Sequence, residues 1–187
     1  MALGYRTAAS ILVMLVIACG GDAERDTPSR EAPPIGEAPQ MGQSNDADIV
    51  EVAEYRLTMD VVQKMHRAQL NIYAAMEQNP QLAQMASMSA EQFSLDAMEE
   101  RFGSVPEIRS AIEEAGLSVR EYGVIMLALF QASFAQASLE MGAQRDTVLA
   151  ATHMNPDNLE FVEQNRDALR QMQDDLEAAS RRAGAPE

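Results

Sequence analysis

Apolar residues recur three or four positions apart along much of the chain, which is the spacing that gives a helix one buried face. The first such stretch runs from Met59 to Gln78, where Thr58 is placed to cap it, and its stripe is Val61, Met65, Ala68, Ile72 and Ala75. The last stretch begins at Asn155-Pro156 and runs to about Arg182, and its stripe is Val162, Asn165, Leu169, Met172, Leu176 and Ala179. The two patterns predict two long outer helices of a bundle.

Between these two helices lies a segment that is apolar nearly all round. Residues 119–141 carry no charge between Glu121 and Glu140, which is typical of the central helix of a bundle or of a membrane span. Ser133, Ser138 and two glutamines dilute its second half, so a buried central helix is favoured over a membrane-inserted or partner-facing one. If Gln131 and Gln136 are buried without partners, they would line a cavity in which a ligand could lie.

Ser-x-x-Glu/Gln sequences predict where further helices begin, because the serine and the residue three positions later each satisfy a free backbone N–H. They occur at Ser89, Ser104 and Ser118. Glycines that should follow helix ends are Gly103, Gly116 and Gly142. Short helices are expected from Asn79-Pro80 to about residue 88, and over about 90–102 and 105–115.

Residues 49–57 fit either a short extended arm or a helical lead-in, and no strand-like alternation follows them. The whole pattern therefore predicts an all-α protein, a bundle of about five or six helices with a buried central helix. Residues 20–47 contain four prolines, four glycines and six acids but no aromatic residue, which is typical of a disordered linker. We expect a helical domain over 48–187, preceded by this tether.

The N-terminal segment has a different pattern. Arg6 precedes an uncharged apolar run from Ala8 to Ala18. This run is shorter than the roughly 20 residues that a helix needs to cross a bilayer, but it matches the apolar region of a secretory signal peptide. It ends in Val16-Ile17-Ala18-Cys19, followed by Gly20. The sequence resembles a bacterial lipobox, with an aliphatic residue at −3, a small residue at −1 and the cysteine at +1.

This resemblance implies a lipoprotein in which residues 1–18 are removed and Cys19 carries acyl chains such as palmitate. Several acyl chains anchor a protein stably in a lipid bilayer. The alternatives are a plain secretory peptide or a buried cysteine. Gly20 at +2, in place of aspartate, favours the outer membrane over the inner one in a host with the usual sorting rule. The domain would then be lipid-anchored and face the periplasm.

Composition excludes several classes of protein. The formal charge is −15 and the pI is about 4.4, so the chain lacks the basic surface that binds nucleic acid. A single cysteine excludes an internal disulfide and a cysteine-based zinc or iron–sulfur site. The expected helical domain, residues 48–187, has a net charge of −12.

Candidate chemistry is sparse. Neither His66 nor His153 has a glutamate three residues before it, so the Glu-x-x-His motif of di-metal bundles is absent. Met85 and Met88 are spaced so that two thioethers could meet one soft ion, and with His66 they are weak candidates for a Cu(I) site. A His/Met-ligated haem is a further alternative. The favoured interpretation is packing, because Met65, Met76, Met126 and Met172 fall on apolar stripes.

The mature part resembles uncharacterised bacterial exported proteins, on residues 116–122 (GLSVREY) and 155–162 (NPDNLEFV). That resemblance implies no activity. We expect a non-enzymatic envelope interaction protein without a cofactor, with the bilayer and a protein as its partners. The alternative is a binder of a small apolar ligand or of copper between the helices.

Overall fold

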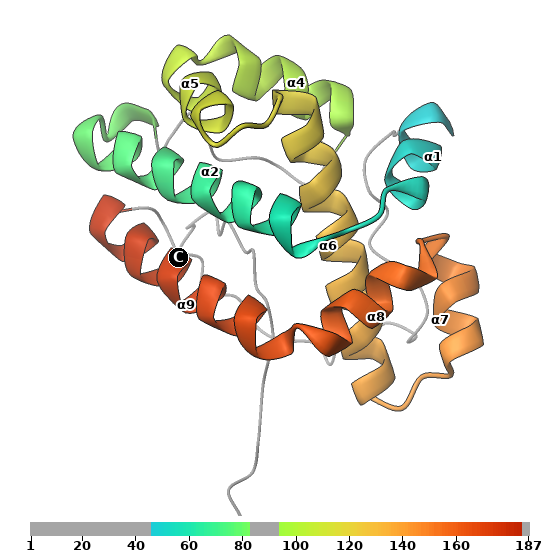
Figure 1. The fold of residues 1–187 in the computed structure, drawn as a ribbon. Coiled ribbons are helices and arrows are strands. Elements are labelled where there is room, and N and C mark those ends of the chain that lie inside the picture. Colours follow the sequence, from blue (N-terminus) through green and yellow to red (C-terminus); the bar gives the residue numbers. More distant parts are fainter. Residues whose placement is uncertain (1–45, 83–93, 185–187) are drawn as a thin grey trace, which may run out of the picture.

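A computed structural model describes residues 46–82 and 94–184 of the chain (Figure 1). These residues contain eight α-helices and no strand, which confirms the all-α prediction. The helices, labelled as in Figure 1, are α1 (Asp46–Glu54), α2 (Met59–Gln78), α4 (Leu95–Ser104), α5 (Pro106–Glu114), α6 (Val119–Glu140), α7 (Arg145–Thr152), α8 (Pro156–Gln164) and α9 (Arg166–Ala183).

Helix α6 is the central helix of the bundle, as its apolar composition predicts (Figure 1). It contacts α1, α2, α4, α5, α7 and α8, whereas α9 packs along α2. Its buried residues are Tyr122, Gly123, Val124, Ile125, Leu127, Ala128, Ala132 and Ala135. Most of them lie in the first half of the helix, so the second half is less completely covered.

The close packing of α4 against α6 depends on Gly123. A Cβ at this position would lie 3.2 Å from Leu95 Cδ2 and 3.9 Å from Met98 Sδ. The neighbouring Tyr122 ring meets Phe102 edge-on, with centroids 5.9 Å apart. Burial raises the pKa of the Tyr122 phenol above its ordinary value, and a hydrogen bond with Gln69 opposes this only in part. The first half of α6 is thus enclosed by large side chains.

Of the predicted cap residues Thr58, Ser104 and Ser118, two are confirmed and one is wrong. Thr58 caps α2, and the Ser118 hydroxyl accepts from Glu121 N at 3.1 Å to cap α6. Ser104 is instead the last residue of α4, and its Oγ donates to Arg101 O. The reason is Pro106, which disfavours helical backbone at Val105 and so places the break there. Ser89 lies outside the described residues.

This difference between the two serines gives a direct test. Ser118→Ala should lower the free energy of unfolding by about 1 kcal/mol, because it removes a helix cap. Ser104→Ala should change it by less than about 0.5 kcal/mol, since this serine caps no helix start and its one hydrogen bond, to Arg101 O, is exposed. Urea unfolding followed by circular dichroism measures both. Equal losses from the two variants would contradict the capping assignment.

Glycines end two helices as predicted. Gly116 and Gly142 have φ of 85° and 95°, a conformation that side chains disfavour. Gly103 lies inside α4, so its prediction as a terminator is wrong. The α4 helix begins instead after Ser94, whose hydroxyl accepts from Ala97 N at 3.2 Å.

The predicted long C-terminal helix is two helices. Asn165 ends α8, and both its backbone N–H and its side-chain Nδ2 donate to Phe161 O, at 3.0 and 2.8 Å. An asparagine side chain that bonds a nearby backbone carbonyl in this way competes with helix continuation. The break lets α8 pack on α6 while α9 turns to pack on α2 (Figure 1). Helix α7, which periodicity did not reveal, fills the gap between α6 and α8 in the sequence.

The start of the domain also differs in detail from the sequence prediction. Helix α1 begins at Asp46, two residues before the expected boundary, and it settles the ambiguous segment as helical up to Glu54. Residues 55–58 then connect α1 to α2 without helix. Of the helix expected from Asn79-Pro80 to residue 88, only residues up to Leu82 lie within the described part, and residues 81–82 are helical.

Candidate functional site

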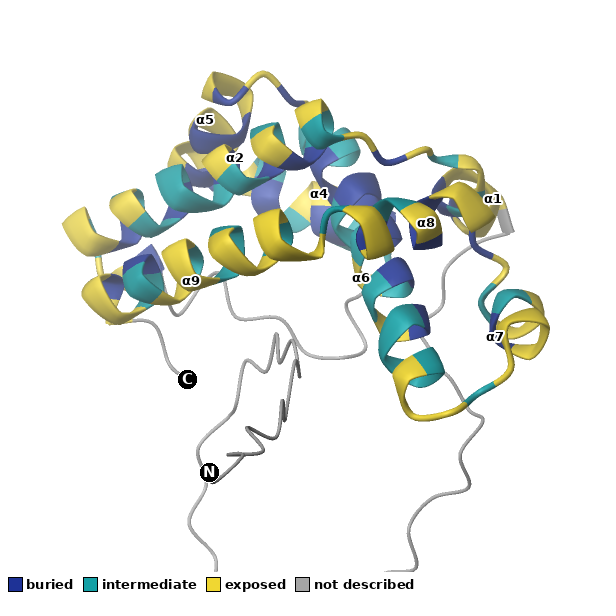
Figure 2. Ribbon diagram, turned by 60° about the horizontal axis from the view of Figure 1, so that its bottom comes forward, coloured by how far each residue is buried: buried dark blue, intermediate teal, exposed yellow. Residues whose placement is uncertain are grey.

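An apolar stripe runs along α6 and is exposed on the second half of the helix. Phe130, Phe134 and Met141 are 38%, 36% and 76% exposed, and Met126 is only partly buried. At about 100° per residue, these four residues and Ala137 fall within an arc of about 80° and along about 22 Å of helix. Figure 2 shows the change along α6, from buried turns to intermediate and exposed ones. We call these five residues the α6 stripe.

Small and neutral residues flank the α6 stripe. Ser133 lies on one side and Ser138 on the other, and Ala137 lies within it. The nearest charged residue of the helix is Glu140, and its Oε1 lies 2.9 Å from Arg166 Nη2. Small residues allow another backbone to approach closely, and a paired charge adds no uncompensated carboxylate to the surface. The stripe is therefore suited to burial against another helix.

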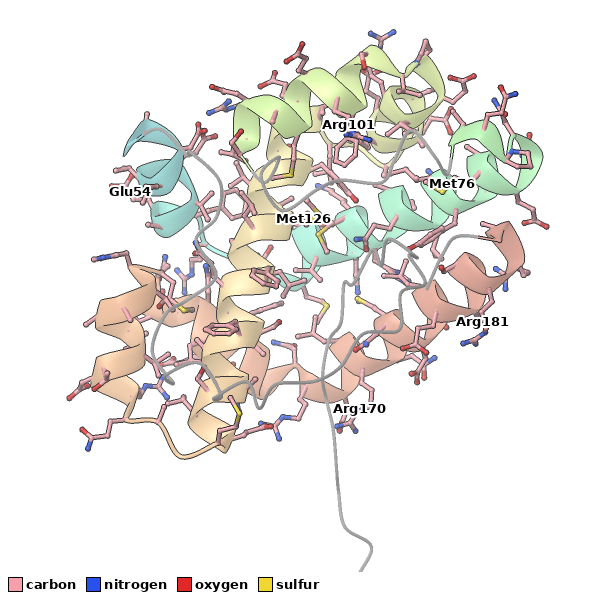
Figure 3. The ribbon with its side chains drawn as sticks, turned by 180° about the vertical axis from the view of Figure 1, so that it is seen from behind. Glu54, Met76, Arg101, Met126, Arg170 and Arg181 are labelled. Carbon is pink, nitrogen blue, oxygen red and sulfur yellow. The ribbon has the colours of Figure 1, made fainter. Side chains whose placement is uncertain are left out.

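Length and composition alone would also let α6 cross a membrane, and it is one such helix among the described residues. Of its most apolar window, 44% is buried inside the bundle. The same helix carries Arg120 near its first turn, bonded to carboxylates of two other helices. The packing thus makes α6 a core helix with one uncovered face. Met126, labelled in Figure 3, lies near the point where α6 crosses α2.

Arg120 is surrounded by four carboxylates from two helices. Its guanidinium lies 2.6 Å from Glu51 Oε2 and 2.9 Å from Asp48 Oδ1 on α1, and 3.2 Å from Asp96 and 3.3 Å from Glu99 on α4. The hydrogen bond with Glu51, more than those with the other acids, raises the pKa of Arg120 further above its ordinary value. Asp48 is 3% exposed and the Arg120 side chain 34%, so this ion pair is partly buried. The cluster joins α1 and α4 to α6.

Asn158 fixes the connection between α1 and α2. Its Oδ1 accepts from Leu57 N and its Nδ2 donates to Tyr55 O, both at 2.8 Å. Asn158 is 1% exposed and lies on α8, about a hundred residues along the chain from its partners. One amide side chain therefore satisfies two backbone groups that belong to no helix. Neither Asn158 nor Arg120 stood out in the sequence, because their partners are distant along the chain.

The histidines do not form a metal site in the described part of the chain. His66 is half-buried on α2, and its Nε2 is enclosed without a hydrogen-bond partner. His153 has a φ of 50° and ends α7, as expected of a loop residue. Within residues 46–82 and 94–184, no group of three or more histidines, cysteines or acids could hold a metal ion. The sulfur candidates Met85 and Met88, and the lipidation candidate Cys19, lie outside these residues, so the copper and lipidation predictions stay predictions.

Two glutamines of α6 have buried side-chain oxygens. Gln131 Oε1 and Gln136 Oε1 are enclosed without a hydrogen-bond partner, although Gln136 Nε2 donates to Glu140 at 3.2 Å. The two glutamines are five positions apart and so point to different sides of the helix. They do not converge on one cavity.

A groove of about 660 Å³ lies elsewhere, between α2 and α5. It is lined by Asn71, Ala74, Ala75, Gln78, Pro106, Glu107, Ser110, Ala111 and Glu114. Several of its polar groups already bond one another, since Asn71 Nδ2 donates to Ala111 O and Ser110 Oγ donates to Glu114. The groove is open and only partly apolar, so it does not resemble a closed site for a small apolar ligand.

The methionines on apolar stripes pack in the core. Met65 and Met76 are buried, and Met126 and Met172 are partly buried against the core. This agrees with the favoured interpretation, in which methionine fills irregular space between helices.

Comparison with known proteins gives no family for this chain. No protein-family model, no curated protein and no solved structure matches it. Among the described residues, core packing leaves Phe130, Phe134 and Met141 of the α6 stripe exposed, and it also leaves Ile49 and Val50 exposed on α1.

Proposed function

We propose that this chain is a lipid-anchored, non-enzymatic interaction protein of the bacterial envelope, and that its α6 stripe docks another protein. The observation that carries the proposal is the exposure of Phe130, Phe134 and Met141 along one face of the central helix. Contiguous exposed apolar surface marks interaction sites, and aromatic residues and methionine are enriched in the cores of protein interfaces.

Charge favours a protein over a membrane surface as the occupant of the stripe. Residues 48–187 carry a net charge of −12, which opposes close approach to anionic lipid headgroups. Amphipathic segments that lie on membranes are usually rich in lysine and arginine on their polar face. The stripe instead has Ser133 and Ser138 at its edges. A helix of another protein can bury this stripe without meeting an unpaired charge.

The lipobox-like sequence at 16–19 supports the proposed location in the bacterial envelope. With Cys19 acylated, the 26 residues between it and Asp46 would hold the domain about 30 Å from the anchor if they behave as a flexible chain. That reach would place the α6 stripe clear of the headgroups and within the periplasm. Gly20 at +2 favours the outer membrane as the site of the anchor.

One experiment on the full chain tests the anchor and the docking face together. A photo-reactive amino acid replaces Phe130 in the wild-type chain and in a Cys19→Ala variant, both expressed in a bacterium that processes lipoproteins. The wild-type chain should be shortened and fractionate with membranes, and Cys19→Ala should keep its precursor length because the acylated residue is gone. Gel mobility and membrane flotation measure both.

The same cells report on docking. Irradiation should give a discrete adduct when the probe is at position 130. A matched probe at Gln63, exposed on α2, should give none. Unchanged processing and full membrane association of Cys19→Ala would refute the anchor. Equal labelling from positions 130 and 63 would refute the docking face.

A further inference from the structure

We propose that the α6 stripe pairs with the α6 stripe of a second copy of this chain, in an antiparallel arrangement related by a twofold axis. This inference rests on the proposed function, and it names the partner of the same face. The α6 stripe has the sequence order Met126, Phe130, Phe134, Ala137, Met141. This order complements itself when the helix is reversed.

The complementarity follows from helix geometry. If the twofold axis passes between Ser133 and Phe134, each residue faces the one at the same distance on the other side of the axis. Phe130 of each copy then lies over Ala137 of the other, so a large side chain fills the space left by a small one. Met126 of each copy lies beside Met141 of the other. The two Phe134 rings meet at the axis on one edge of the interface, and the two Ser133 side chains meet on its other edge.

Charge is compatible with this pairing despite the acidic domain. Helix α6 carries no charge between Glu121 and Glu140, and Arg166 neutralises Glu140 at 2.9 Å. Like charges elsewhere on the two copies are screened over a Debye length of about 8 Å at physiological ionic strength. An isologous interface therefore buries no uncompensated carboxylate.

The small apolar area that the two stripes can bury predicts a weak dimer in solution. Taking about 200 Å² for each full side chain, the exposed parts of Phe130, Phe134 and Met141 amount to about 300 Å² per copy. Two copies together fall below the roughly 1,200 Å² of stable interfaces. Anchoring both copies in one membrane raises their effective concentration, which strengthens weak contacts without new ones. We expect dimers on the membrane and mostly monomers in dilute solution.

Cysteine cross-linking on the full chain in isolated membranes tests the geometry. Ser133→Cys should give a chain dimer with a short bifunctional maleimide, because the two positions lie next to the axis. Differently tagged Met126→Cys and Met141→Cys chains should cross-link to each other. Two Met126→Cys chains should not, since their thiols would lie about 22 Å apart. The wild-type chain, which has Cys19 alone, is the background control.

Two substitutions test whether the stripe holds the pair. Phe134→Glu, made in the Ser133→Cys chain, should abolish the dimer band because it brings two carboxylates together at the axis. Ala137→Phe should abolish it as well, since it fills the space that Phe130 of the other copy needs. Gln63→Glu adds the same charge on exposed α2 and should leave the band unchanged. Circular dichroism of each variant shows whether the fold is retained.

Failure of this inference is distinguishable from failure of the proposed function. A folded Ser133→Cys chain without a dimer band overturns the pairing, and a strong band between two Met126→Cys chains overturns its antiparallel direction. If the probe at position 130 then gives an adduct with a different protein, the docking proposal stands and only the second copy is excluded. If neither experiment gives an adduct, both proposals are wrong.

Discussion

Asn158→Ala should lower the free energy of unfolding by about 2–5 kcal/mol, because it leaves one buried and one partly buried backbone group without partners at about 1–3 kcal/mol each. The groups are Leu57 N–H and Tyr55 C=O, both 2.8 Å from the Asn158 amide. Loss of these bonds should also loosen residues 55–58, the connection between α1 and α2. Urea unfolding measures the first effect and amide hydrogen exchange the second.

Asn165→Ala is the matched control for this prediction. Its Nδ2 also donates to a backbone carbonyl, that of Phe161, but this carbonyl accepts a backbone hydrogen bond from the same residue. The expected loss is therefore about 1 kcal/mol or less. Losses of the same size in the two variants would contradict the role assigned to Asn158.

Arg120→Met should lower the free energy of unfolding by about 2–3 kcal/mol, since it removes a cation from a partly buried ion pair whose carboxylate is buried. Asp48, which is 3% exposed, is the carboxylate most affected, while Glu51, Asp96 and Glu99 are 41–68% exposed and can be rehydrated. Helix α1 should be released first, because its buried contacts reduce largely to Val52 and Asp48. Faster amide exchange over residues 46–54 than over α2 would report this release.

Arg170→Met is the control for the loss of a cation. Arg170 pairs with Asp167 at 3.6 Å on the surface of α9, a contact worth about 0.5 kcal/mol or less. If Arg120→Met lowers the free energy of unfolding no more than Arg170→Met does, the cluster contributes no more than a surface ion pair. Arg120→Lys should lower the free energy of unfolding less than Arg120→Met does, because lysine keeps the positive charge. It should not restore the wild-type value, since an ammonium lacks the several N–H donors with which the guanidinium reaches two helices.

Local signals allowed most helices to be predicted. Met59–Gln78 and its Thr58 cap, the Ser118 cap of α6 and the terminators Gly116 and Gly142 each depend on residues within a few positions of one another. Such features need no distant partner, so a pattern reveals them. The errors at Ser104 and Asn165 have a local cause too. Pro106 ends helical backbone at Val105, and the Asn165 side chain bonds the carbonyl of Phe161, so each outweighed the periodic pattern.

The candidate site could be predicted only in part from the sequence. The sequence marked α6 as uniformly apolar, and a uniformly apolar helix gives no direction in which one face could be left uncovered. Which face stays open depends on where its neighbours end. Helices α2 and α4 cover the first half of α6, and the second half extends beyond them (Figure 1).

By itself, the sequence determined the helical class, the acidic charge and the lipobox-like motif at Cys19, because these follow from composition and short-range spacing. Tertiary structure decided which parts of α6 are buried, and it brought Arg120 to acids 21–72 positions away and Asn158 to backbone groups about a hundred positions away. The physical reason is that burial and ion pairing depend on which surfaces meet in space, and no periodicity along one helix specifies its neighbours.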